Sequence, residues 1–517
     1  MTMQNETGVR TRRRRGGAPA GDAPARPVNY HSLRNPFPPV PVFTDDRVAA
    51  IHDTALRVLE ELGIKVLLPE ARALYKAAGA RIDEGSRMVF IGRDIVEAAL
   101  TSAPRSFTLH GAVPKRDLLM ELGTLSFQSG AGAPNVTDHL RGRRPGKLRD
   151  VIELTKMVQH FDAIQMLSPG VEPQDVDAAV RHYAFTRAQL TLSDKIPFIF
   201  SRGTQQVADC FEMLRIVRGL SEDEFRAAPH CYTIINTNSP RQIDVPMAQG
   251  LTDFARAGQP SIVTPFCLMG AMAPVTVAGA LTLSHAEALA GITLTQLARP
   301  GAPVLYGAFA SNVDMKSGAP AFGTPEQVKA SLGSGQLARL LGLPWRNAAG
   351  CAANINDAQA AHETQMSTWG AVLAGATVVI HAAGWIEGGL TVSYEKFMTD
   401  MEMVQIFAEL CAETPAEDAE IAFDALAEVQ PGGHFFGCAH TMERYSSAFY
   451  EPVVADWSNF GTWTERGALD ASERATGIWQ RVVDEHQPPA SVQPDRVAAL
   501  DEFIARRSAE GGAPPDS

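Results

Sequence analysis

The chain has 517 residues, 45% of them hydrophobic and 20% charged, and its formal net charge at pH 7 is −12. A chain of this length and composition can bury a large core, either as one big domain with additions or as two to three smaller domains. The overall negative charge argues against a nucleic-acid-binding surface over the body of the chain.

The N-terminal segment differs from the rest in composition. Residues 10–27, RTRRRRGGAPAGDAPARP, are basic and then rich in Ala, Gly and Pro. They carry too little apolar surface to offset the entropy lost on ordering, so we expect residues 1–43 to form a disordered basic tail. A polybasic run can also contact RNA or an anionic membrane, but a solvated arm is the simpler interpretation, and we expect neither as a partner.

The sequence predicts a cytoplasmic protein. No segment has the roughly 18 uninterrupted apolar residues that a membrane span needs, and the N-terminus lacks the apolar region of a secretory signal. The six cysteines are scattered singly through the chain, which fits reduced thiols better than a disulfide or zinc framework.

Residues 44–115 have the pattern of a small α+β region. They begin with the amphipathic stretch DDRVAAIHDTALRVLEELGIKVL, which runs from a helix into a strand, and continue with two further helical segments. We therefore predict an N-terminal α+β cap over this range.

From residue 116 to residue 412 one pattern repeats: a short apolar run, a loop of small polar residues, and a longer segment with helical spacing. Strands that are apolar on both faces and alternate with helices indicate a parallel sheet. Eight such units suit a closed (β/α)8 (TIM) barrel better than an open sheet. The eight runs are TLSFQS (from 124), IQMLSPG (164), PFIFS (197), CYTIINTNS (231), SIVTPFCLMG (261), PVLYGAFAS (303), WRNAAGCAA (345) and TVVIHAAGW (377).

Helix boundaries in this range carry local signals. Thr204, Thr324 and Asn356 precede helical runs as N-cap candidates, and Gln327 and Gln359 follow the last two at capping-box spacing. Glycines just past the helical runs predict helix ends at residues 219, 258, 342 and 375.

Residues 413–517 are predicted to form a helical C-terminal extension, interrupted by PGGHFFGCAHTMERYSSAFYEP. His434, Cys438 and His440 lie close together within it, but their spacing is neither that of a helical histidine pair nor that of a zinc knuckle. We therefore predict no metal site. The glycine-rich stretches also lack the context of a nucleotide-binding loop, and no serine lies in a nucleophile elbow.

The active site of a (β/α)8 barrel lies at the carboxyl ends of its strands, so the polar residues there are candidates. Asn354 follows the seventh run and has no evident capping role, which leaves function and loop hydrogen bonding equally open. His381 follows the eighth run and is either a satisfied core histidine or a functional group. Glu387 lies in GWIEGG, where glycines give the backbone the freedom of a binding loop. Phe309, Asn312 and Asp314 lie at another junction, and Trp385 lies between His381 and Glu387.

Four stretches resemble the trimethylamine methyltransferase family: GAFASNVDMKSGAPAFGTPE (307–326), NDAQAAHE (356–363), IHAAGWIEGGLTVSYEKF (380–397) and PGGHFFGCAHT (431–441). The resemblance extends over nearly the whole chain. It implies a (β/α)8 barrel that moves a methyl group from a methylated amine to the Co(I) of a separate, cognate corrinoid protein. The corrinoid (cobalamin) is then carried by the partner, and no cofactor is bound tightly by this chain. We also expect a homo-oligomer.

The resemblance also concerns the substrate. Family members that act on trimethylamine carry pyrrolysine at the end of the seventh strand, and the DAQA stretch at 357–360 places Asn354 at or beside that position. The absence of pyrrolysine argues against trimethylamine as the substrate.

A quaternary ammonium supplies its own leaving group, a neutral tertiary amine, and methyl transfer from it to a strong nucleophile needs chiefly alignment. Because this cation cannot donate hydrogen bonds, aromatic faces and nearby negative potential must hold it. We predict that Phe309, Trp385 and Tyr394, with Asn312 and Asp314, bind the substrate, and that Asn354, His381 and Glu387 are catalytic.

If the substrate is a betaine, a donor must bind its carboxylate. His381, Asn354, Arg202 and Lys396 are possible donors, and we favour the first two because an amide binds a carboxylate without adding full charge. The leading hypothesis is a corrinoid-dependent methyltransferase for a quaternary amine such as glycine betaine. The alternatives are a barrel that binds such amines but has lost transfer, and a metal-dependent lyase.

Overall fold

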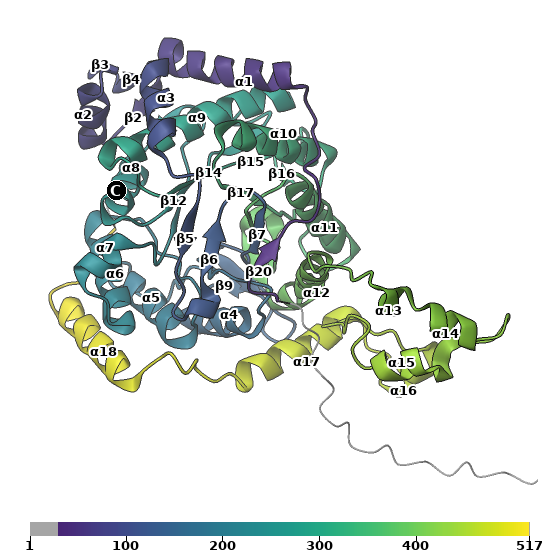
Figure 1. The fold of residues 1–517 in the computed structure, drawn as a ribbon. Coiled ribbons are helices and arrows are strands. Elements are labelled where there is room, and N and C mark those ends of the chain that lie inside the picture. Colours follow the sequence, from purple (N-terminus) through teal and green to yellow (C-terminus); the bar gives the residue numbers. More distant parts are fainter. Residues whose placement is uncertain (1–28, 516–517) are drawn as a thin grey trace, which may run out of the picture. The chain divides into compact units, whose positions relative to one another are not determined.

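The computed structural model describes residues 29–515, which fall into two compact units (Figure 1). One unit comprises residues 29–412 and 452–515, and the other comprises residues 413–451. The predicted disordered segment lies outside the described residues as far as residue 28.

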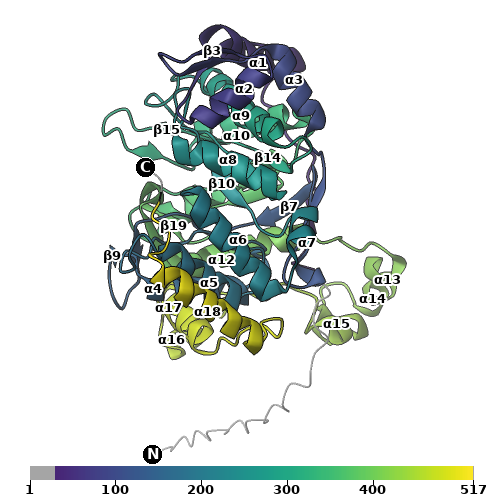
Figure 2. The same cartoon turned by 90° about the vertical axis from the view of Figure 1, so that its left-hand side faces the viewer.

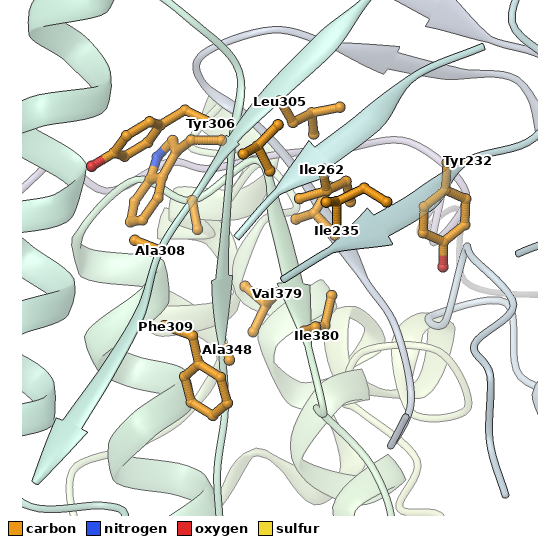
Figure 3. Close-up of a cluster of buried hydrophobic side chains, with 14 of the residues drawn as sticks. Tyr232, Ile235, Ile262, Leu305, Tyr306, Ala308, Phe309, Ala348, Val379 and Ile380 are labelled. Atoms are coloured by element: carbon orange, nitrogen blue, oxygen red, sulfur yellow. The ribbon is translucent and has the colours of Figure 1, made fainter. Parts of the chain in front are cut away.

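The centre of the larger unit is a mainly parallel sheet with the strand order β1-β7-β18-β17-β14-β12-β10. Its buried strands are rich in β-branched and other apolar residues, as expected where helices cover a parallel sheet. The strands are β1 (Leu33–Arg34), β7 (Thr124–Phe127), β10 (Thr233–Ile235), β12 (Ser261–Val263), β14 (Val304–Gly307), β17 (Trp345–Ala348) and β18 (Val378–Ile380). Figure 3 shows side chains of these strands gathered in one cluster, among them Ile235, Ile262, Leu305 and Val379.

Isolated parallel bridges continue the strand pairing beyond β7 and β10. Gln128 pairs with Met166, Met166 with Ile196, and Phe198 with Tyr232. All eight apolar runs of the sequence therefore contribute either a strand of this sheet or a bridge residue. The mixed α/β class predicted from the sequence is confirmed.

Helices alternate with these strands in the chain and cover the sheet (Figures 1 and 2). They are α4 (Leu148–His160), α5 (Arg181–Leu192), α6 (Thr204–Arg218), α7 (Glu222–Ala227), α8 (Val245–Ala257), α9 (Val277–Ala298), α10 (Pro325–Leu341), α11 (Ala358–Leu373) and α12 (Tyr394–Leu410).

Most of the predicted helix boundaries are confirmed. Thr324 caps α10 by accepting a hydrogen bond from the Gln327 N–H, and Gly219, Gly258 and Gly342 end their helices in the left-handed conformation. Such a conformation is free of strain only for glycine.

Two predicted N-caps are wrong by one residue. Gly203 is the N-cap of α6, so Thr204 lies inside the helix. Asp357 caps α11, where its carboxylate accepts from the Ala360 N–H at 3.1 Å. The Asn356 amide is used elsewhere, because it donates to Ser472 Oγ at 2.8 Å and accepts from Thr399 Oγ1 at 3.1 Å.

The larger unit contains three further small sheets. Two of them, with the strand orders β13-β15-β16 and β19-β20-β8-β9, follow the carboxyl ends of main strands. Their strands are β8 (Asn135–Thr137), β9 (Arg144–Pro145), β13 (Phe266–Met269), β15 (Phe309–Val313), β16 (Pro320–Ala321), β19 (Trp385–Ile386) and β20 (Thr391–Ser393). The third pairs β5 (Phe107–Leu109) with β6 (Leu118–Met120).

The predicted α+β segment at 44–115 contains a sheet with the order β11-β2-β4-β3, in which β11 (Gln242–Ile243) comes from the central part of the chain. Its helices α1 and α3 pack against α9, so it shares the core of the larger unit. The remaining elements are α1 (Asp45–Arg57), a π-helical turn at Val58–Leu62, β2 (Ile64–Val66), α2 (Pro69–Ala77), β3 (Arg81–Asp83), β4 (Met88–Phe90) and α3 (Arg93–Ser102).

Residues 29–43 correct the predicted tail. Leu33 is buried and pairs with Leu125 of β7, and Phe37 packs edge-on against Trp369. The side chain of Gln336 accepts hydrogen bonds from the N–H groups of Val42 and Phe43. These contacts with distant parts of the chain order the segment. The sequence pattern indicated only its low local propensity for regular structure.

Among residues 29–515, one helix, α9, has the length and composition of a membrane span. It is 72% buried over its most apolar window and packs against α1, α3, α8 and α10. It also carries the buried polar residues His285 and Glu287. Helix α9 is therefore a core helix of this unit.

The C-terminal segment contains helices in both units. Within residues 413–451 lie α13 (Asp418–Ile421), α14 (Phe423–Glu428) and α15 (Ala439–Arg444). In the larger unit, α17 packs on α12 and α18 packs on α6. The helices there are α16 (Phe460–Glu465), α17 (Ala471–Asp484) and α18 (Pro494–Ala509).

Candidate active site

A cavity of about 660 Å³ lies beyond the carboxyl ends of the parallel strands. Its walls come from the segments that follow β7, β10, β12, β14 and β18, from Pro169 and residues 198–202, and from one residue of β17. The aromatic part of the lining consists of Phe198, Phe200, Phe266, Phe309 and Trp385.

Phe309 is the centre of the aromatic wall. Its ring centroid lies 4.9 Å from that of Phe266, 5.6 Å from Phe322 and 6.1 Å from Trp385. Phe322 in turn packs edge-on against Trp385 at 5.1 Å. Strands β13 and β15 pair in register from Phe266 and Phe309 onward, which holds these two rings side by side. The result is a closely packed aromatic surface on this side of the cavity.

His381 joins this wall immediately after β18. Its backbone has φ = +60°, a left-handed conformation that is uncommon for a residue other than glycine. The imidazole stacks on the Trp385 indole with centroids 4.5 Å apart and an interplanar angle of 18°. Burial, reinforced by the charge of Arg346, holds the pKa of His381 well below its ordinary value, so the ring is neutral at pH 7. Both His381 Nδ1 and Trp385 Nε1 are buried without a hydrogen-bond partner.

Arg346 is the second residue of β17, and its side chain reaches the cavity from within the sheet. Only 2% of the residue is exposed, and its Nε and Nη1 atoms are buried without a hydrogen-bond partner. Its Cζ atom lies 5.2 Å from the centroid of the Phe309 ring. Burial lowers the pKa of Arg346 to about 9, which leaves the guanidinium charged at pH 7. Sequence reasoning missed this residue, although an arginine inside an otherwise buried strand was a signal that could have revealed it.

A loop of polar residues forms another part of the lining. It contains Asn236, Thr237, Asn238 and Ser239, which directly follow β10. Thr237 Oγ1 and Ser239 Oγ both donate to the carboxylate of Glu287 at 2.6 Å. Glu287 is buried on α9, and this burial raises its pKa. Helix α9 therefore holds the loop at residues 236–239 in place through these two hydrogen bonds.

None of the residues that line the cavity is an aspartate or a glutamate. Two of them, Arg202 and Arg346, are arginines. Arg202 is paired with Glu172, at 2.8 Å between Nη1 and Oε1, and Glu172 also pairs with Arg181. Arg346 is in no ion pair within the described part of the chain, and the cavity therefore has a net positive character.

The structure brings together three of the predicted site residues, since Phe309, His381 and Trp385 all line the cavity. The others are outside its lining. Tyr394 is buried and donates to Glu153 at 2.7 Å. Asn312 accepts from Thr324 Oγ1 at 2.7 Å, whereas Asp314 is exposed and accepts from Ser317 within a turn.

The two remaining predicted residues lie on neighbouring loops. Asn354 is exposed. Glu387 forms a bidentate ion pair with Arg143, with its shorter contacts at 2.9 Å, while the glycines that follow it, Gly388 and Gly389, line the cavity. The carboxylate of Glu387 is thus committed to a surface partner.

Two further candidates from the sequence also have partners. Lys396, considered as a carboxylate donor, is buried in an ion pair with Asp400. In the His434/Cys438/His440 segment, Cys438 Sγ lies 3.3 Å from Thr441 Oγ1. Over residues 29–515, no group of three or more His, Cys, Asp or Glu side chains is arranged to hold a metal ion.

Comparison with known proteins identifies the family. The family model described as trimethylamine methyltransferase (MTTB) matches residues 9–512. The chain belongs to this family, as its sequence motifs predicted. It is 34% identical over 479 residues to a glycine betaine methyltransferase of Desulfitobacterium hafniense, covering 92% of this chain and 99% of that protein. The protein is therefore a methyltransferase.

Other relatives are named for a different amine, trimethylamine. A trimethylamine methyltransferase, MttB, of Desulfitobacterium hafniense is 30% identical over 461 residues, which is 88% of this chain and 92% of that protein. Among solved structures, the monomethylamine methyltransferase MtmB of Methanosarcina barkeri aligns over 89% of this chain and 92% of its own, with 9% identity and a TM-score of 0.44.

Proposed function

We propose that this methyltransferase moves a methyl group from a quaternary amine of the glycine betaine type to the Co(I) of a separate corrinoid protein. The observation that carries the proposal is the aromatic wall around Phe309 in a cavity whose lining contains no carboxylate. The name of the relative that is 34% identical supports the choice of amine.

The aromatic wall suits a cation that cannot donate hydrogen bonds. Trimethylammonium groups bind to the faces of Trp and Phe rings, whose quadrupole attracts positive charge. Phe309, Phe266 and Trp385 present such faces within a single cluster. Among the predicted binding residues, we keep Phe309 and Trp385 in this role, and Tyr394 would support the wall only from outside the cavity.

The reaction breaks the bond between the quaternary nitrogen and a methyl carbon, and the nitrogen keeps the electron pair as a neutral tertiary amine. The acceptor provides the electron pair of the new bond to carbon, so no proton moves in this step. This chain therefore needs to hold the amine, align one N–methyl bond with the acceptor and exclude water. The neutral His381, stacked on Trp385, fits a positioning role and does not need to act as an acid or base.

We also infer that the eight strand positions close into a (β/α)8 barrel. The bridges Gln128–Met166, Met166–Ile196 and Phe198–Tyr232 lead from β7 round to β10, the two ends of the parallel run. The cavity then occupies the carboxyl-terminal mouth, where barrel enzymes place their chemistry. A separate corrinoid protein would approach this mouth, and no tightly bound cofactor is required of this chain.

Two further parts of the proposal concern the surroundings of the enzyme. All six cysteines are free, which fits the cytoplasmic location that we propose. We propose a homo-oligomer on the basis of the family resemblance alone.

The test is methyl transfer with purified components. The protein is incubated with reduced, Co(I)-state corrinoid protein or free cobalamin and with glycine betaine, choline or tetramethylammonium, and the cobalt spectrum and the demethylated amine are followed. We expect transfer from glycine betaine. Absence of transfer from every quaternary amine would contradict the proposal, and binding without transfer would indicate a barrel that has lost its activity.

A matched pair of variants tests the aromatic wall. Phe309→Leu removes the central ring and keeps an apolar side chain, so betaine binding should weaken about 5- to 30-fold through the lost cation–π attraction. The control is Phe211→Leu, in a separate aromatic cluster with Phe225 and Phe254 at 5.1 and 5.0 Å. Equal effects of both variants would show that ring loss acts only through stability.

A further inference from the structure

We propose that Arg346 binds a carboxylate of the substrate, and that the enzyme therefore takes N-methylated zwitterions and rejects simple quaternary ammonium ions. This inference rests on the proposed function, since it concerns the same cavity. It names a residue that sequence reasoning did not consider.

The direction of the Arg346 side chain follows from its strand. Successive residues of a strand point to opposite faces, so Trp345 and Asn347 share one face and Arg346 and Ala348 the other. Trp345 is directed toward the helices, where its Nε1 donates to the Gly375 carbonyl at 2.7 Å. Arg346 therefore points away from these helices, to the face of the sheet on the side of the cavity.

The missing partner of Arg346 is the central observation. Buried charges in proteins are normally paired, because removing a guanidinium from water costs a large free energy. Arg346 is 2% exposed, it has no ion pair among the described residues, and two of its nitrogens are buried and unpartnered. Such a group is retained where a ligand supplies the missing anion.

The charge of the lining excludes a simple cation as the preferred ligand. A site for choline or tetramethylammonium would combine aromatic faces with a carboxylate, yet none of the lining residues is acidic. An unpaired guanidinium in the same cavity repels a cation. A zwitterion resolves this conflict, because its carboxylate neutralises Arg346 while its ammonium contacts the aromatic faces.

The arrangement along the strands gives the zwitterion a direction. Arg346 lies within β17, whereas His381, Trp385 and the glycines at 388 and 389 follow the end of β18. A carboxylate on Arg346 would lie at the floor of the cavity, with the trimethylammonium group nearer the mouth. The neutral His381 offers a ring nitrogen, Nδ1, as a second hydrogen-bonding group near the carboxylate. The methyl group to be transferred would then face the side from which the acceptor approaches.

Binding measurements with three probes test this inference without the corrinoid protein. Glycine betaine carries both charges, choline keeps the trimethylammonium and lacks the carboxylate, and 3,3-dimethylbutanoate keeps the carboxylate and replaces the nitrogen by neutral carbon. Each is titrated by calorimetry into the wild type, Arg346→Met, Arg346→Lys and the control Arg187→Met. Arg187 forms an ion pair with Asp501 away from the cavity.

The expected pattern is a reversal of selectivity. The wild type and Arg187→Met should bind glycine betaine and 3,3-dimethylbutanoate more tightly than choline. Arg346→Met should lose about 10- to 100-fold in affinity for both carboxylates, the loss expected for a charge-assisted hydrogen-bonded pair, and should gain affinity for choline. Arg346→Lys should fall between them, because it keeps the charge but not the two-pronged geometry.

Two results would overturn the inference. One is Arg346→Met binding glycine betaine within twofold of the wild type, and the other is a wild type that binds choline as well as glycine betaine. If Arg346→Met does not fold, Arg346→Lys and the comparison of probes on the wild type still decide. Failure of methyl transfer in the presence of normal, Arg346-dependent betaine binding would contradict the proposed function and leave this inference intact.

Discussion

Two buried cations of the larger unit have opposite surroundings. Lys396 on α12 is 0% exposed, and its Nζ contacts the Asp400 carboxylate and donates to Thr364 Oγ1 at 2.7 Å. Asp400 also accepts from the Gly384 N–H at 2.9 Å, so every member of this group has a partner. Arg346 is almost as deeply buried, yet no carboxylate in the described chain lies within ion-pair distance of it.

This difference in pairing distinguishes a cation that supports the fold, Lys396, from one that we propose binds a ligand, Arg346. A buried charge whose partners are all provided by the protein holds segments together, here α11, α12 and the loop at Gly384. A buried charge left without a partner carries a desolvation cost that an anionic ligand offsets. The same contrast applies to polar rings, because Tyr394 is hydrogen-bonded whereas Trp385 Nε1 and His381 Nδ1 are not.

The largest expected effect is on the scaffold pair. Lys396→Met leaves the Asp400 carboxylate buried without its cation, so the free energy of unfolding should fall by about 3–5 kcal/mol. Chemical denaturation of the purified variant measures this. The double variant Lys396→Met/Asp400→Leu should recover much of the loss, because it removes both charges. A single-variant loss under about 1 kcal/mol would show that the pair is not a scaffold element.

The corresponding substitution at Arg346 should have the opposite sign. Arg346→Met removes an unpaired buried charge, and the free energy of unfolding of the ligand-free protein should rise by about 1–3 kcal/mol. The matched control is Arg218→Met, because Arg218 donates to the His110 carbonyl at 2.8 Å and its loss should be destabilising. A marked destabilisation by Arg346→Met would mean that Arg346 supports the fold.

How far the sequence could predict this contrast depends on the range of the interactions. Lys396 and Asp400 are four residues apart on one helix, so predicting that helix also predicts that the two side chains lie close together. The isolation of Arg346 depends on what strands distant in sequence place around it, which no local pattern contains. The alternation of strands and helices and the glycines that end the helices could also be predicted, because both depend on residues that are neighbours in the sequence.

Other site residues show the same limit. Phe309, His381 and Trp385 were identified because they follow strands, and the carboxyl ends of parallel strands meet at one edge. Tyr394 and Glu387 follow strands too, but Tyr394 faces Glu153 and Glu387 faces Arg143, partners more than 240 residues away in the chain. Residues 29–43 were assigned to the tail because their packing on β7 and α10 is tertiary.

The pH dependence of stability extends the comparison to His381. The folded protein keeps this buried ring neutral because its pKa is well below 6.5, whereas the unfolded chain binds a proton near that value. Stability should therefore fall as the pH decreases below about 6.5, by about 1 kcal/mol for this residue between pH 7 and 5.5.

His381→Asn tests this, because asparagine tolerates the left-handed backbone and does not titrate. Its unfolding free energy should change less between pH 7 and 5.5 than that of the wild type, by about 1 kcal/mol, in denaturation series at both pH values. Identical pH profiles would mean that the ring is solvated enough to titrate normally in the folded state.

The smallest expected change in stability is at Asn354. The nearby Asn356 provides the comparison, since both side chains are amides but only Asn356 has hydrogen-bond partners in other segments of the described chain. Asn356 is bonded to Ser472 and Thr399, so Asn356→Ala should cost about 0.5–1.5 kcal/mol of unfolding free energy. Asn354 is exposed, and Asn354→Ala should change this free energy by less than about 0.5 kcal/mol and leave betaine binding unchanged.

Its predicted catalytic role then concerns only the transfer step. The backbone carbonyls of Cys351 and Ala353 accept hydrogen bonds from the N–H groups of Gly388 and Glu387, so the loop before Asn354 adjoins the rim of the cavity. Under the proposed function the methyl acceptor approaches this rim, and Asn354 would then lie on its path. We expect Asn354→Ala to lower the rate of methyl transfer while its melting temperature and its betaine affinity stay at the wild-type values. An unchanged transfer rate would assign Asn354 to the loop alone and leave the selection of substrate to the residues that line the cavity.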